Sequence, residues 1–102
     1  MIIRIVQMEF EEERIPDFLN IFALSREKIR SFPGCMHLQL LQGEGDSCVF
    51  FTYSHWQSED YLDTYRNSEL FRGVWRRTRK LFRVAPKAWS LTDQTETTVS
   101  NP

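Results

Sequence analysis

Hydrophobic and polar positions alternate in the first ten residues and then change to a helical spacing. Residues 1–10 are rich in Ile and Val and alternate, which predicts a β-strand. In residues 11–32 the apolar side chains recur three or four positions apart, as on one face of a helix: Ile15, Phe18, Leu19, Phe22 and Ile29. Pro16 suits the first turn of this helix, and the sequence FPG at residues 32–34 ends it.

The next two apolar runs, residues 35–42 and 47–56, are separated by GEGD, which predicts a β-hairpin. If Gln42 faces Ser47 across the loop, one hairpin face is wholly apolar: Met36, Leu38, Leu40, Val49, Phe51 and Tyr53. The other face is mixed: Cys35, His37, Gln39, Leu41, Cys48, Phe50, Thr52 and Ser54. In this register Cys35 and Cys48 lie far apart, so we expect no disulfide between them. A one-residue bulge would shift these faces.

Two capped helices and a last strand complete the pattern. Ser58, with two acidic residues behind it, predicts the start of a short helix that runs to about residue 66. Ser68 predicts a second N-cap, and the helix after it carries an apolar stripe: Phe71, Val74, Trp75, Thr78 and Phe82. Residues 84–92 form the last strand, and Pro86 favours an edge position or a bulge.

This order of elements predicts a ferredoxin-like α+β fold, with an antiparallel βαββαβ sheet and both helices on one face. The other sheet face would then expose apolar hairpin side chains, namely Leu41, Cys48 and Phe50. An exposed apolar patch is the usual mark of an interface. We therefore expect a homodimer formed by contact between two sheet faces.

Composition narrows the class of protein. The chain has 102 residues, 41% hydrophobic and 14% aromatic, so it can form one domain with its own core. We expect that domain over residues 1–91 and a flexible tail over residues 92–102. The net charge of -1 gives no reason to expect nucleic acid or an anionic membrane as a partner, and no apolar run could span a bilayer. No signal peptide is recognisable, so a cytoplasmic location is the default expectation.

Seven basic residues and no acidic one lie from Arg72 to Lys87. Four of them follow one helical face, opposite the apolar stripe: Arg72, Arg76, Arg79 and Arg83. The pattern is typical of a solvated face near a helix C-terminus. The alternative is a site for an anion or for an acidic segment of a neighbouring molecule.

The residues at the corners of this pattern resemble the antibiotic biosynthesis monooxygenase family of dimeric α/β barrels. Pro33, Gly34 and Cys35 match the turn that leads the family's second strand. Four later residues match the segment after the third strand and the helix that follows: Trp56, Ser58, Ser68 and Phe71. The resemblance covers about residues 2–91. It implies oxygenation of an aromatic or quinol-type molecule without metal or flavin, so we expect no cofactor.

Tyr65 stands where the family usually has His. A phenol with a reference pKa of about 10 neither shuttles protons near neutral pH nor ligates a metal as readily as imidazole does. In the family's haem-degrading branch an Asn, a Trp and a His ligand occupy positions that here correspond to Gln7, Tyr65 and Trp75. Because indole cannot ligate iron, we do not expect haem degradation by that route.

Six residues are candidates for a small-molecule site. Tyr65, Gln7 and His37 would supply the polar contacts of catalysis, Tyr65 as a hydrogen-bond donor or weak acid and His37 as a base. The apolar walls would come from Met36, Phe71 and Trp75. Neither His37 nor His55 has a further ligand at metal-binding spacing, so we predict no metal site. Packing or ordinary hydrogen bonding is the structural alternative for each candidate.

Two functions remain open. The first is a cofactor-independent monooxygenase-like enzyme for a small aromatic or quinol-type molecule, because an electron-rich substrate can react with oxygen itself once it is deprotonated. The second is a non-catalytic homodimer of the same fold that binds a small ligand or serves a structural role. The missing family histidine favours the second, since membership of a family does not carry an activity by itself.

Overall fold

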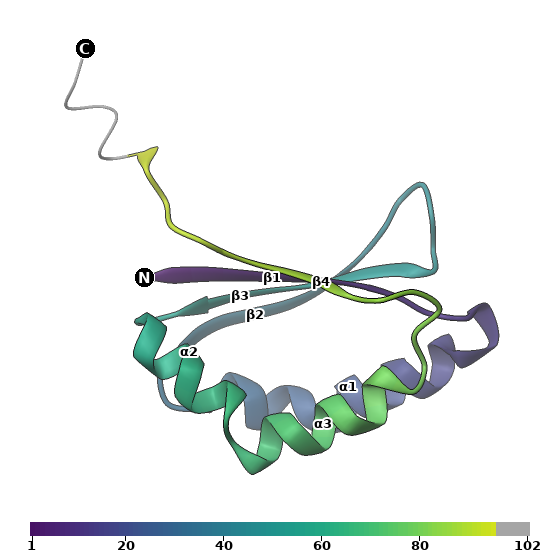
Figure 1. Cartoon of the computed structure of the whole chain (residues 1–102), viewed down its shortest axis with the longest axis horizontal. Helices are drawn as coiled ribbons and strands as arrows, with labels where there is room; N and C mark the ends of the chain where they lie inside the picture. Colours follow the sequence, from purple (N-terminus) through teal and green to yellow (C-terminus); the bar gives the residue numbers. More distant parts are fainter. Residues whose placement is uncertain (96–102) are drawn as a thin grey trace.

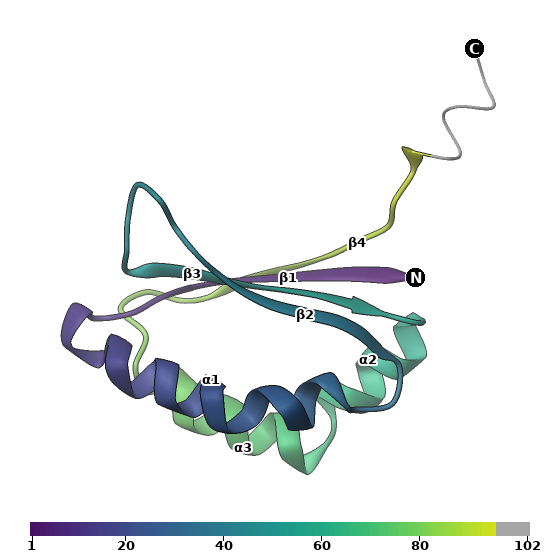
Figure 2. The same ribbon diagram turned by 180° about the vertical axis from the view of Figure 1, so that it is seen from behind.

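In the computed structural model, which describes residues 1–95, helices cover one face of a four-stranded antiparallel sheet (Figure 1). The strands are β1 (Ile2–Glu9), β2 (Cys35–Gln42), β3 (Val49–Trp56) and β4 (Lys87–Leu91), in the sheet order β2-β3-β1-β4. The helical elements are η1 (Glu12–Arg14), α1 (Ile15–Arg30), α2 (Glu59–Arg66) and α3 (Glu69–Arg79). The reverse view in Figure 2 shows the same single helical layer. The predicted ferredoxin-like α+β fold is confirmed.

Local signals in the sequence explain where the helices begin. Ser68 Oγ accepts the backbone N–H of Phe71 at 3.1 Å, and Ser58 Oγ accepts that of Tyr61 at 3.4 Å, so both predicted N-caps are confirmed. Gly34, in the turn after α1, has a φ of 86°. A Cβ at Gly34 would overlap the Tyr61 ring, so both the positive φ and the lack of space require glycine in this turn.

The hairpin register differs from the predicted one, which corrects the assignment of the two faces. Gln42 lies opposite Phe50 instead of Ser47, and a bulge interrupts the ladder between Cys35 and His37. Because side chains alternate, an odd shift moves one strand's side chains to the opposite face relative to the other strand. The hairpin residues that face the helices are Leu38, Leu40, Phe50, Thr52, Ser54 and Trp56. Those on the open face are His37, Gln39, Leu41, Phe51, Tyr53 and His55.

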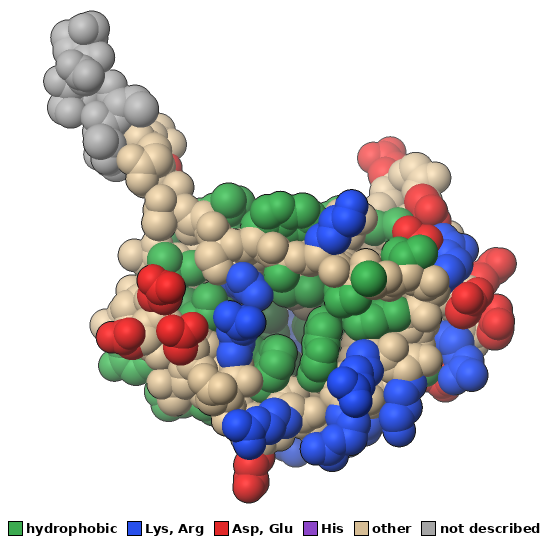
Figure 3. Space-filling model, viewed as in Figure 1, with side chains coloured by type: hydrophobic (Ala, Val, Ile, Leu, Met, Phe, Trp, Pro, Cys, Tyr) green, Lys and Arg blue, Asp and Glu red, His purple; other side chains and the backbone are tan. Residues whose placement is uncertain are grey.

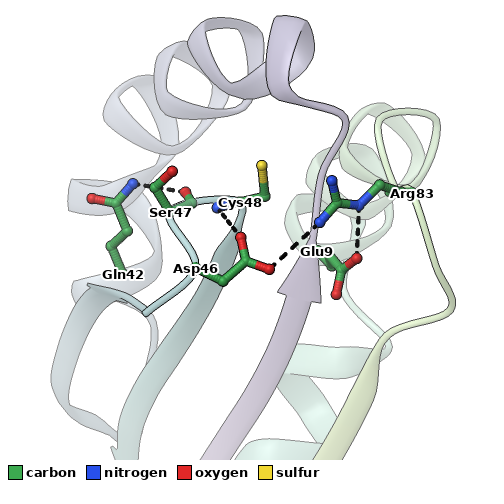
Figure 4. Close-up of polar contacts among 6 residues, drawn as sticks. All are labelled: Glu9, Gln42, Asp46, Ser47, Cys48 and Arg83. Atoms are coloured by element: carbon green, nitrogen blue, oxygen red, sulfur yellow. Dashed lines mark hydrogen bonds and ion pairs between the residues drawn. The ribbon is translucent and has the colours of Figure 1, made fainter. Parts of the chain in front are cut away.

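The register changes because the loop between β2 and β3 is longer than GEGD. Cys48 leaves the ladder with β2: its N–H binds Asp46 Oδ1 at 3.0 Å, and its carbonyl accepts the Phe10 N–H at 3.0 Å. Arg83 then fixes the loop from outside (Figure 4). Its Nε lies 2.7 Å from Glu9 Oε2, and its Nη2 lies 3.6 Å from Asp46 Oδ2. The loop conformation therefore depends on two segments that are distant in sequence.

Two clusters of buried side chains fill the space between the sheet and the helices. The larger contains Met8, Phe10, Phe18, Phe50 and Leu81. The smaller contains Cys35, Trp56 and Leu62, with Tyr65 packed against it. Cys35 and Cys48 are both buried and free. We expected Leu41, Cys48 and Phe50 to be exposed on the far side of the sheet. Only Leu41 is exposed, and Cys48 and Phe50 are core residues.

None of residues 1–95 covers the sheet face away from the helices (Figure 1). Its apolar side chains come from all four strands: Ile3, Ile5, Leu41, Phe51, Tyr53, Trp89 and Leu91. Trp89 is 42% exposed, and Nε2 of His55 is buried without a hydrogen-bond partner among residues 1–95. We call this surface the open face.

Candidate functional site

A cavity of about 340 Å³ lies between the helix-facing side of the sheet and helices α1 and α3. Figure 3 shows a hollow framed by hydrophobic side chains, with Lys and Arg side chains at its edge. The lining draws on both core clusters, with Met8 and Phe18 from the larger and Trp56 from the smaller. The volume lies within the usual range for small-molecule sites, about 300–1,000 Å³.

Aromatic rings form a continuous wall along this cavity. The Tyr65 ring stacks on Trp56 with ring centroids 4.8 Å apart and meets the Phe71 ring edge-on at 5.2 Å. Phe71 in turn stacks on Trp75 at 5.8 Å, with 11° between the ring planes. Because Ser68 caps α3 directly after α2 ends, the chain turns between Tyr65 and Phe71, and the two rings can meet. Three of the six predicted site residues, Tyr65, Phe71 and Trp75, therefore line one cavity.

The smaller core cluster holds Tyr65 in place. The Trp56 side chain beneath it is 1% exposed, and its indole N–H donates to Ser54 Oγ at 3.0 Å. Ser54 Oγ also lies 3.5 Å from the Arg4 carbonyl oxygen, which links the indole to β1. The aromatic wall is thus anchored on the centre of the sheet.

The Tyr65 hydroxyl makes no hydrogen bond to any residue that the structure describes. Burial raises the pKa of Tyr65 well above its usual range, and the charge of a Cys35 thiolate would act in the same direction. Tyr65 is therefore a neutral phenol at physiological pH. It can donate a hydrogen bond to a ligand, but it does not take up or release protons readily there.

The other three predicted site residues do not line the cavity. Gln7 and His37 lie on the open face, opposite Phe51 and His55 respectively, because their strand positions have the other parity. His37 Nε2 lies 2.8 Å from Gln39 Oε1. Met36 sits at the bulge of β2 and is 52% exposed. Within one chain, the sheet separates Gln7 and His37 from Tyr65.

Sequence reasoning missed the polar residues that do line the cavity: Arg4, Thr52, Ser54, Arg66, Thr78 and Lys87. Arg4 carried a recognisable signal, because it interrupts an apolar strand at the same parity as Val6 and Met8. Burial lowers the pKa of Arg4, the Arg66 charge lowers it further, and Asp63 acts in the opposite direction.

The basic residues of α3 lie outside this site. Helix α3 ends at Arg79, so Arg83 does not continue its basic face as we predicted but pairs with Glu9 of the same chain. Arg72, Arg76 and Arg79 are exposed. The described part of the chain contains no group of three or more His, Cys, Asp or Glu side chains that could hold a metal ion. None of the helices in that part is long and apolar enough to cross a membrane.

The architecture is shared with solved structures. The chain is 22% identical to a protein solved as an antibiotic biosynthesis monooxygenase, with 91% of this chain and 98% of that one covered and a TM-score of 0.86. It is 17% identical to a conserved protein from Methanosarcina mazei Go1, with coverage of 91% and 93% and a TM-score of 0.86. It is 20% identical to a protein from Pseudomonas aeruginosa, with coverage of 90% and 92% and a TM-score of 0.79. These likenesses show the fold.

The family follows from the sequence itself. No curated protein matches the chain significantly. The sequence profile of the family described as antibiotic biosynthesis monooxygenase matches residues 1–77, which includes β1 to β3, α2 and most of α3. The chain therefore belongs to the antibiotic biosynthesis monooxygenase family.

Proposed function

We propose that this protein is a cofactor-independent monooxygenase-like enzyme that acts on a small aromatic or quinol-type molecule in the cavity. The observation that carries the proposal is the Tyr65 hydroxyl, a neutral donor without a partner in the described chain, on the wall of an aromatic cavity. Stacked rings on α3 offer flat apolar surface to a planar ligand.

The substrate can supply all the electrons for such a reaction. A CH₂ carbon next to an electron-rich ring loses a proton, which later returns to the peroxide, and the resulting anion passes an electron to O₂. The two radicals then combine to a peroxide, and loss of water leaves a carbonyl group. One oxygen atom enters the product and the other leaves in water. The protein would bind the substrate and stabilise its developing oxyanion, which is the role of the Tyr65 donor.

One observation favours the second candidate, a homodimer that binds a small ligand without transforming it. No Asp, Glu or His side chain of the described residues lines the cavity. With Tyr65 held neutral, the cavity has no group that accepts a proton near pH 7. An enzyme at this site would therefore depend on a substrate that ionises readily.

Oxygen uptake decides between these functions. We expect wild type to raise oxygen consumption above autoxidation for at least one member of a panel of quinols and polyphenols. Tyr65→Phe should lower kcat for that substrate about 100-fold, as expected for loss of one donor to an oxyanion. Tyr61→Phe is the matched control, because Tyr61 lies on the same helix, α2, and does not line the cavity.

The outcomes separate the claims. No catalysed oxygen uptake by wild type across the panel would overturn the enzyme and leave the ligand-binding homodimer. Equal kcat values for wild type and Tyr65→Phe would overturn the role of Tyr65 alone.

We also propose that two copies of the chain pair through their open faces. The support is the apolar surface of the open face, with Trp89 at its edge strand. Light scattering at micromolar concentration should give twice the monomer mass of 12.2 kDa. Trp89→Arg should shift the mass toward the monomer, whereas Leu24→Arg on α1, where Leu24 is 70% exposed, should not. A monomeric wild type would refute the pairing.

A further inference from the structure

We infer that the cavity binds its aromatic ligand as an anion, whose charged oxygen faces Arg4 and Arg66. This inference names the substrate class of the proposed enzyme, and it rests on the proposed function for the choice of this cavity. Four features of the cavity carry it: an arginine without an acid, a second arginine beside it, a lining without carboxylates, and an apolar wall.

Arg4 is a half-buried charged side chain on the helix-facing side of the sheet. It lies in the middle of β1, on the helix-facing side, opposite Ser54 of β3 and Ser90 of β4. Its Nη1 donates to Ser90 Oγ at 2.9 Å, and no carboxylate of the described residues lies within 4.0 Å of it. Charges that leave bulk water are normally paired. Most of the donors in the Arg4 guanidinium remain available to a ligand.

Arg66 brings a second positive charge to the same cavity. It is the last residue of α2 and is exposed, and its charge acts on Arg4. Asp63 offsets this in part, but it neither lines the cavity nor forms an ion pair with either arginine. Two positive charges close together destabilise each other's charged form, so an anion bound between Arg4 and Arg66 would stabilise the charged form of both arginines.

The rest of the lining fits an aromatic ring and gives no support to a cation. Lys87 also borders the cavity, but its position opposite Gln7 gives its side chain the parity of the open face, and no acidic side chain within residues 1–95 lines the cavity. Phe71 and Trp75 present stacked rings. Arginine binds a planar carboxylate or enolate oxygen with a fork of N–H donors. A ligand with a flat apolar body and one anionic oxygen therefore satisfies both parts of the cavity.

The same arrangement explains how a cavity without a base could support oxidation. Two nearby positive charges favour the ionised form of a bound phenol or enol and lower its pKa. The proton can then leave to water before or during binding. Positive charge that promotes ionisation of the ligand would compensate for the missing family histidine as a base.

Paired neutral and anionic probes test the inference. We would measure binding of 2-naphthoate and of 2-naphthamide to wild type, Arg4→Gln, Arg66→Gln and Arg77→Gln by calorimetry. The control, Arg77, is an exposed arginine of α3 that does not line the cavity. We expect wild type to prefer naphthoate at least about tenfold, and each of the two cavity variants to lose about tenfold or more for naphthoate only. Naphthoate affinity should also fall as salt rises, and the indole N–H signal of Trp75 rather than that of Trp89 should shift in NMR spectra.

Three results would overturn the anion site. Wild type could bind both probes with equal affinity, it could bind neither, or Arg77→Gln could lose as much naphthoate affinity as the two cavity variants. The oxygen-uptake assay is scored separately. Selective naphthoate binding without oxygen uptake would keep the anion site and overturn the enzyme. Oxygen uptake with a preference for neutral ligands would keep the enzyme and overturn the anion site.

Discussion

Replacing Ser54 with Ala should destabilise the protein by about 1–3 kcal/mol, which is the cost of leaving a buried polar group without a partner. Ser54 Oγ accepts the Trp56 indole N–H at 3.0 Å, and the Ser54 residue is only 6% exposed. Water therefore has little access to the N–H once the hydroxyl is gone. The contact of the hydroxyl with the Arg4 carbonyl is 3.5 Å long and contributes little.

A double-mutant cycle isolates this hydrogen bond. Trp56→Phe removes the indole donor while keeping an aromatic ring under Tyr65. In the Trp56→Phe background, Ser54→Ala should cost about 1 kcal/mol less than it does in wild type, because no donor is left unpaired. Ser90→Ala is a control for loss of an exposed hydroxyl.

Urea unfolding followed by far-UV circular dichroism measures these free energies without relying on the fluorescence of Trp56. In thermal unfolding, each kcal/mol corresponds to about 4–8 °C for a domain of this size. An equal cost of Ser54→Ala in both backgrounds would refute the reasoning, since the loss would then come from packing around Ser54 and not from the indole. A loss below about 0.5 kcal/mol in wild type would refute it as well.

Four other changes should have measurable effects on stability. Gly34→Ala should lower the free energy of unfolding by more than about 1–2 kcal/mol, because it adds overlap with Tyr61 to the strain of a positive φ; a smaller loss in urea unfolding would contradict this. Ser68→Ala should cost about 1 kcal/mol in the same assay through loss of the α3 cap. The pKa of Tyr65 is higher in the folded protein than in the unfolded chain, so the free energy of unfolding should be unaffected by this residue below about pH 10 and fall above it, by up to about 1.4 kcal/mol per pH unit. Tyr65→Phe should remove this contribution to the pH dependence in unfolding measured from pH 9 to 12, whereas Tyr61→Phe should not. Arg4→Met should raise the midpoint of urea unfolding slightly, because it removes a half-buried charge that has no acidic partner among the described residues, and a lower midpoint would instead indicate a structural role.

Local signals made the helical half of the fold predictable. The caps at Ser58 and Ser68 are side-chain hydrogen bonds to N–H groups three residues away, so the sequence around each cap contains all the participants. The aromatic part of the site was predictable for the same reason. Tyr65, Phe71 and Trp75 lie within eleven consecutive positions, and the break between two helices brings their rings together.

Long-range contacts decided what the sequence could not show. The loop of the hairpin contacts residues that are distant in sequence: the Cys48 carbonyl accepts the Phe10 N–H, and Arg83, which also binds Glu9 from 74 positions away, lies 3.6 Å from Asp46 Oδ2. Once the register shifted by an odd number, the two faces of the hairpin had to be reassigned. The family resemblance points to Gln7, yet Arg4 of the same strand lies on the side that faces the cavity. Only the pairing of β1 with β3 and β4 distinguishes them.

The cavity lining is a poor choice for stability and a good one for binding a charged ring. A small domain gains most from filling its interior with apolar side chains, and aliphatic residues at the Arg4 and Thr52 positions would extend the core across the gap between its two clusters. Instead the cavity is lined by a guanidinium without an acidic partner and by the hydroxyls of Thr52, Ser54 and Thr78, while the Tyr65 hydroxyl lacks a partner in the described structure. Natural proteins retain such groups where binding or catalysis needs them, because the stability lost is small beside the affinity gained. Tyr65 can donate a hydrogen bond but is held neutral, and the positive charges that could stabilise an anion belong to Arg4 and Arg66 of the same lining. If the cavity binds an anion as we infer, its chemistry depends on the acidity of the ligand rather than on a base of the protein.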